Sequence, residues 1–195
     1  GLGEIVSSIK HAYVSSQSTY GYERWLTFVL NSLGDPNLQL NLAGYDEFDN
    51  VEILMSEIDG IEVNTGVDSC NITLVCVDED DNIIVDKVEN VSQYTYDSGY
   101  SGKLYIYITK EGFKAFISDE NPAKNLSIQG MDFYLDNNFA VKNALIGSDV
   151  IPEYESESIM IVSGGSLTLK NTGTVTITKD FECKKGGTLT ITPIQ

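Results

Sequence analysis

The chain has 195 residues, 42% of them apolar, and a formal charge of −17 at pH 7. This apolar content is enough for the hydrophobic core of one domain or of two small domains. No apolar run approaches the roughly eighteen residues that span a membrane. Residues 43–121 hold eighteen acids against four lysines, which excludes nucleic acid and anionic membrane as partners of that segment.

The first part of the chain, residues 1–42, places apolar side chains at helical spacing. Two stripes are present, each suited to one side of an amphipathic helix. They comprise Leu2, Ile5, Val6, Ile9 and Ala12, and then Tyr22, Trp25, Leu26, Val29 and Leu30. The second stripe ends at Gly34-Asp35-Pro36, because glycine closes a helix and proline cannot continue one. We therefore predict a helical segment, and since the sequence opens directly on it, a fragment of a longer protein.

The second part, residues 43–121, alternates apolar and polar side chains as strands do. The clearest unit is a predicted hairpin, in which Cys70–Val77 leads through the polar residues 78–82 into Ile83-Ile84-Val85. Leu104, Ile106 and Ile108 predict a further strand. Several short strands separated by polar turns are typical of an immunoglobulin-like β-sandwich.

The third part, residues 122–195, contains an internal repeat. Gly164-Gly165-Ser166-Leu167-Thr168-Leu169 recurs as Gly186-Gly187-Thr188-Leu189-Thr190-Ile191, displaced by 22 positions. Short alternating strands that repeat between glycine turns are typical of a small β-solenoid or β-roll, whose stacked turns bury the Leu, Ile and Val positions. The whole chain is thus predicted to be mainly β, with a helical segment at the start.

Residues Tyr22–Leu40, with Leu33-Gly34-Asp35-Pro36 inside them, resemble the last helix of gingipain-like cysteine peptidases, which belong to the caspase-fold clan. Gly3-Glu4 and the helix that follows resemble the preceding helix of that family. The resemblance implies that residues 1–42 are the remnant of an upstream catalytic domain, followed by an immunoglobulin-like domain. The C-terminal repeat, with Phe181-Glu182-Cys183 before Lys185-Gly186-Gly187, is similar to the end modules of secreted surface proteins of gut-type bacteria. The family's catalytic His and Cys lie upstream, and no position here corresponds to them.

The resemblance therefore implies a non-catalytic C-terminal segment of a secreted or cell-surface bacterial protein, which holds or presents an upstream catalytic or surface domain and adheres to a glycan or a host or surface protein. No signal-peptide pattern opens the sequence. One alternative is a carbohydrate-binding module, and another is a subunit of a cysteine peptidase whose catalytic chain is separate.

Tyrosines suggest a binding surface. If Tyr94 and Tyr96 pair across from Tyr105 and Tyr107, four phenol rings share one sheet face, which is suited to stacking on sugar rings or receiving a partner protein. Simple cross-strand packing is the alternative interpretation.

Asp78, Asp80 and Asp81 offer hard oxygens to a calcium ion, although the loop lacks the spacing of a known calcium motif. A solvated acidic turn is the simpler interpretation. The single histidine, His11, has no nearby activating acid, so we expect no catalytic dyad and no cofactor.

The three cysteines predict no disulfide framework. Cys70 and Cys76 lie on one predicted strand, roughly 20 Å apart at the rise of a strand. Together with Cys183 they occupy positions that read as buried, and we expect them to act as small apolar side chains.

Overall fold

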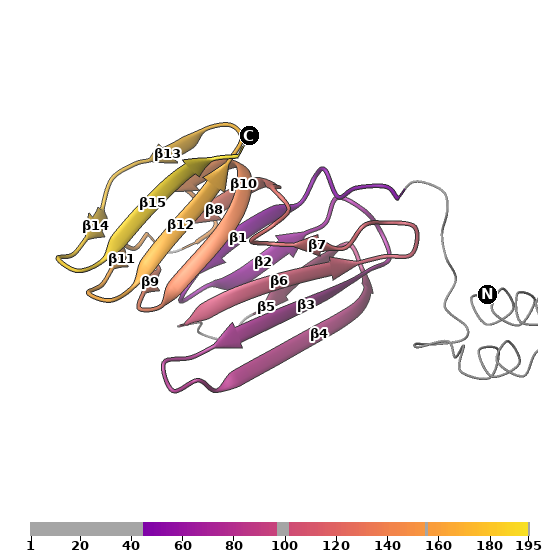
Figure 1. Ribbon diagram of the computed structural model, residues 1–195, viewed down its shortest axis with the longest axis horizontal. Helices are drawn as coiled ribbons and strands as arrows, with labels where there is room; N and C mark the ends of the chain where they lie inside the picture. The colour runs from indigo at the N-terminus through magenta and orange to yellow at the C-terminus, as the bar shows by residue number, and fades with distance from the viewer. Residues whose placement is uncertain (1–44, 97–101, 155, 195) are drawn as a thin grey trace, which may run out of the picture. The chain divides into compact units, whose positions relative to one another are not determined.

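The computed structural model describes residues 45–96, 102–154 and 156–194, and these residues form strands and loops without a helix (Figure 1). The mainly β prediction is confirmed for this part. The predicted helices of residues 1–42 lie outside the described residues. Within the described ranges, no helix has the length and apolarity that crossing a membrane requires.

In the described residues, fifteen strands form three sheets. Eight belong to the first sheet, in the hydrogen-bonded order β15 (Thr188–Pro193), β12 (Ser166–Asn171), β10 (Asp136–Ile146), β8 (Ala123–Ile128), β1 (Glu52–Ser56), β2 (Gly60–Asn64) and β5 (Gln93–Tyr96), with β13 (Val175–Ile177) also on β10. The second sheet is β14 (Phe181–Cys183), β11 (Ile159–Ile161) and β9 (Asp132–Phe133). The third sheet is β4 (Ile83–Val91), β3 (Cys70–Val77), β6 (Lys103–Thr109) and β7 (Phe116–Ile117).

The predicted hairpin is confirmed as β3 and β4, which pair antiparallel from Val77↔Ile83 to Cys70↔Val91. Alternate residues of β3 are buried, because successive side chains of a strand point to opposite faces. The buried set is Cys70, Ile72, Leu74 and Cys76. The same alternation buries Leu104, Ile106 and Ile108 of β6, which confirms the predicted strand there.

The first and second sheets contain parallel strands stacked in the register of the sequence repeat. β12 pairs with β15 from Ser166↔Thr188 to Asn171↔Pro193, and β11 pairs with β14 at Ile159↔Phe181. Leu167 therefore lies beside Leu189 in the next turn of the chain. The earlier strands β8 and β10 continue the same parallel order.

The Gly-Gly pair of the repeat has a steric reason. Gly164 and Gly186 have φ of +94° and +92°, a conformation that side chains disfavour. A Cβ on Gly165 would lie 2.0 Å from the carbonyl oxygen of Phe133, and one on Gly187 would lie 2.7 Å from that of Ile161. The first glycine makes the turn and the second lets successive turns approach closely.

One sheet joins the two predicted β segments. β1 pairs parallel with β8, from Glu52↔Asn125 to Met55↔Ile128, so the first sheet continues from β5 to β15 (Figure 1). The predicted boundary at residues 121 and 122 falls inside this arrangement. One hydrophobic cluster includes residues on both sides of that boundary, and Asp46–Gln195 form one compact unit.

Candidate functional site

The four predicted tyrosines do not share a sheet face, and that part of the prediction is wrong. Tyr94 and Tyr96 lie on β5, which pairs with β2 at Val63↔Tyr94 and Ile61↔Tyr96. Both are partly buried and pack against the core. The Tyr94 hydroxyl donates a hydrogen bond to the Asp86 carboxylate on β4. These two rings therefore cover the core at β5 and are not on the sheet that carries Tyr105 and Tyr107.

Tyr105 and Tyr107 instead lie on the outer side of the third sheet. They alternate with the buried residues of β6, and their rings stack with centroids 6.5 Å apart and an interplanar angle of 24°. Directly across from Tyr105 lies Val75 of β3, and across from Val75 lies Val85 of β4. Since residues opposite one another in a ladder share a face, these three side chains form one row.

We call this surface the Tyr105 face. It consists of Val75 and Val77 of β3, Ile83 and Val85 of β4, and Tyr105 and Tyr107 of β6. Ile83 and Val85 are 66% and 60% exposed, and the other four are partly exposed. Large apolar side chains clustered on a solvated sheet face are uncommon in a monomer unless something binds them.

Two lysines lie on the same side of the third sheet, Lys103 opposite Val77 and Lys87 opposite Thr73. The Lys103 ammonium lies 5.1 Å from the Tyr105 ring centroid, a distance at which a cation is attracted to an aromatic face. Hydrogen bonding to Tyr105, together with the carboxylates of Asp136 and Asp119, raises the pKa of Lys103. The ammonium is therefore charged at neutral pH and marks one border of the apolar surface.

The acidic loop between β3 and β4 is organised by Asp78. Its carboxylate accepts hydrogen bonds from the backbone N–H of Asp80 at 2.9 Å and of Asn82 at 2.8 Å, and from the Asn82 side chain at 2.9 Å. Hydrogen bonding by Asn82 lowers the pKa of Asp78. This carboxylate closes the hairpin turn, as Asp does in many turns.

The described residues offer the predicted calcium site no support. In residues 45–96, 102–154 and 156–194, no three His, Cys, Asp or Glu side chains gather closely enough to share a metal ion. The Asp78, Asp80 and Asp81 site stays a prediction.

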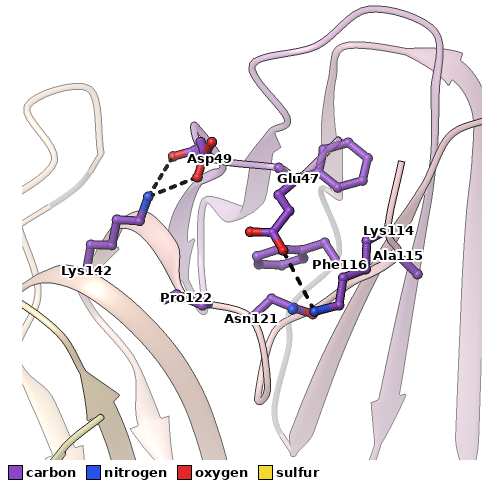
Figure 2. Close-up of a pocket in the computed structure, with 9 residues that line it drawn as sticks. Glu47, Asp49, Lys114, Ala115, Phe116, Asn121, Pro122 and Lys142 are labelled. Atoms are coloured by element: carbon purple, nitrogen blue, oxygen red, sulfur yellow. Dashed lines mark hydrogen bonds and ion pairs between the residues drawn. The ribbon is translucent and has the colours of Figure 1, made fainter. Parts of the chain in front are cut away.

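A small cavity lies between Phe48, Phe116 and Pro122 (Figure 2). Figure 2 shows Lys114 reaching Glu47 and Lys142 reaching Asp49, pairs whose N–O distances are 3.9 Å and 3.4 Å. The volume of this cavity is about 60 Å³, far below that of typical small-molecule sites. Exposed ion pairs of this kind contribute little stability, so the cavity is best explained by packing.

A wider, shallow groove of about 340 Å³ crosses β1, β8, β10 and β13. Its polar side chains bond to one another: the Asn125 amide donates to Glu52 at 2.8 Å, and the Asn143 amide donates to Asn125 at 3.4 Å. This ladder ties neighbouring strands together, so these polar groups already have partners within the protein.

The cysteines are all free, but one prediction about them is wrong. Cys70 and Cys76 are buried, whereas Cys183 of β14 is exposed. β14 belongs to the last described turn of the parallel stack, where no later described strand covers it. Burial, with the Asp86 carboxylate nearby, raises the pKa of Cys76 to about 11.

We expect iodoacetamide at pH 8 to alkylate Cys183 in the native protein while sparing Cys70 and Cys76. Alkylation requires an accessible thiolate, and the raised pKa of Cys76 leaves little thiolate at that pH. Peptide mass spectrometry gives the extent at each site, with urea-unfolded protein as the control in which all three react. Equal modification of Cys76 and Cys183 in native protein would contradict the assigned burial.

The sequence did not lead us to predict four members of the Tyr105 face: Val75, Val77, Ile83 and Val85. The signal was present in the alternation of β3, since the odd-numbered valines lie opposite in phase to the buried Cys70 and Leu74. Joining these residues to Tyr105 and Tyr107 required knowing that β6 pairs with β3.

Comparison of the chain with protein-family models, curated proteins and solved structures finds no match. The resemblance to gingipain-like peptidases thus rests on the residues quoted for it, and these lie outside the described part.

Proposed function

We propose that this chain is a non-catalytic accessory segment of a secreted or cell-surface bacterial protein of the gingipain-like kind, and that its β part is an adhesion module. The module would hold or present an upstream domain while the Tyr105 face binds a partner. The family resemblance of Tyr22–Leu40 supports the setting, and the Tyr105 face supports the binding role.

The observation that carries the proposal is the composition of the Tyr105 face. Residues 43–121 carry eighteen acids and only four lysines, yet this face presents four aliphatic side chains and two tyrosines. An apolar centre with tyrosines and a charged surround is the usual composition of a protein-binding patch. Lys103 and Lys87 border the face on one part and the acidic turn of residues 78–81 borders it on another, so a partner with charges of both signs around its own apolar patch complements it.

A second candidate function is glycan binding through Tyr105 and Tyr107. The observation in its favour is that their rings are nearly parallel, with centroids 6.5 Å apart, and so present neighbouring aromatic surfaces. Against it, the other neighbours on the face are aliphatic, whereas a sugar needs precisely placed hydrogen-bonding groups. We therefore favour a protein partner.

The same proposal includes a finer description of the fold. The antiparallel strands β1, β2 and β5, with β3, β4, β6 and β7 in a separate sheet, support an immunoglobulin-like sandwich. The parallel stack with its 22-residue register supports a short β-solenoid on the same core. A strand pairing shared between them would hold the Tyr105 face on a rigid frame.

The test is binding of the full chain to immobilised fibronectin, fibrinogen and collagen, and to an array of neutral and acidic oligosaccharides. We expect the chain to bind a protein of the panel. The double variant Tyr105→Ala and Tyr107→Ala should lower the affinity about tenfold or more, because tyrosines that become buried in an interface are common binding hot spots. Tyr45→Ala, at a tyrosine that is 54% exposed off this face, is the matched control.

Each result bears on the proposal. Oligosaccharide binding that depends on the same two tyrosines would support the second candidate. Binding that survives the double variant, or no binding to any probe, would contradict a role for the Tyr105 face.

A further inference from the structure

The edge strand β4 begins with three exposed apolar residues in a row. Ile83, Ile84 and Val85 are 66%, 50% and 60% exposed. β4 is the outermost strand of its sheet and pairs only with β3 among the described strands (Figure 1). Its other side therefore presents backbone groups next to uncharged, β-branched side chains, which is the arrangement that accepts another strand.

The remainder of β4 is guarded against such pairing. Asp86 points inward to Tyr94, Lys87 forms an ion pair with Glu89 at 2.5 Å, and Asn90 has a positive φ of 59° beside an irregularity in the β3–β4 register. Charges, an inward-pointing carboxylate and a bulge are the devices that block edge pairing. The first three residues of the strand are its longest run without such a group.

We propose that residues Ile83–Val85 pair with the same residues of a second copy of this chain, antiparallel about a two-fold axis at Ile84. This register places Ile83 opposite Val85 of the second copy and Ile84 opposite Ile84 of the second copy. Apolar side chains therefore meet apolar side chains on both sides of the axis, within the part of β4 that carries no charge. The segment is thus complementary to itself, as a two-fold interface requires.

Such pairing would join the two third sheets into one, with both Tyr105 faces on the same side. A dimer with two coplanar Tyr105 faces could contact the same target surface at two points. Two linked contacts raise the apparent affinity above that of one contact. This consequence rests on the proposed function, whereas the pairing itself does not. The formal charge of −17 on each copy opposes association, so the dimer should tighten as salt screens that repulsion.

The experiment is sedimentation velocity of the full chain over a wide concentration series, at low and at high sodium chloride. We expect a monomer–dimer equilibrium that strengthens with salt. Ile84→Lys should weaken dimerisation about tenfold or more, since it places two like charges at the centre of the interface. Ile83→Lys, at a more exposed position, should do the same and serves if Ile84→Lys unfolds the protein.

Ile191→Lys is the matched control, because Ile191 is an isoleucine of another edge strand, β15, and is 45% exposed. It should leave the dimer intact. A chain that stays monomeric at every concentration and salt, or a dimer that survives both β4 variants, would overturn the proposal. Either result would leave the panel binding of the Tyr105 face to be judged by its own variants.

Discussion

Replacing Asn137 with leucine should lower the free energy of unfolding by about 2–5 kcal/mol, because two buried backbone groups would lose their partner. Asn137, fully buried on β10, accepts a hydrogen bond from the Leu104 N–H at 3.0 Å and donates one to the Gly102 carbonyl at 2.8 Å. Its amide thus joins β6 of the third sheet to β10 of the parallel stack. Urea unfolding followed by circular dichroism measures the loss.

The same change at the next residue is the control. Asn138 lies on the other side of β10 and is partly exposed, so Asn138→Leu should cost under about 1 kcal/mol. Equal effects at residues 137 and 138 would mean that the buried amide does not link the two sheets.

A second large effect is expected in the parallel stack. Leu167→Ala should destabilise the protein by about 2–5 kcal/mol, because Leu167 is fully buried and its truncation leaves a cavity. Leu189→Ala removes the same atoms from the equivalent position one repeat later, where the side chain is only partly buried. We expect Leu189→Ala to lower the free energy of unfolding by about 1 kcal/mol, in proportion to the smaller apolar area that Leu189 buries.

Comparing these two variants tests whether the repeats are stacked on one another. Thermal unfolding of both proteins under identical conditions supplies the comparison. If the two substitutions cost the same, the turns are not stacked in the 22-residue register, and the burial of Leu167 has another cause.

Local patterns predicted local structure well. The period-two alternation of Cys70–Val77, followed by five polar residues, was sufficient for the β3–β4 hairpin, since a strand with one buried face fixes its own register. The Gly-Gly repeat likewise predicted the spacing of the stack, because the same steric need recurs at each turn.

Long-range pairing could not be predicted in the same way. Tyr94 and Tyr105 have similar sequence surroundings, and only the pairing of β5 with β2 sends Tyr94 to the interior. Cys183 alternates like a buried residue, yet its strand belongs to the last described turn of the stack. Nothing local distinguishes such a turn, and nothing local indicates that β1 pairs with β8.

Hydroxyl-radical footprinting of the full chain, alone and bound to the panel protein it recognises, would locate the binding surface most directly. We expect Tyr105 and Tyr107 to lose reactivity on binding, while Tyr45 and Ile191, which are exposed elsewhere, keep theirs. Unchanged reactivity of Tyr105 and Tyr107, with protection confined to the parallel stack, would contradict the binding role of the Tyr105 face.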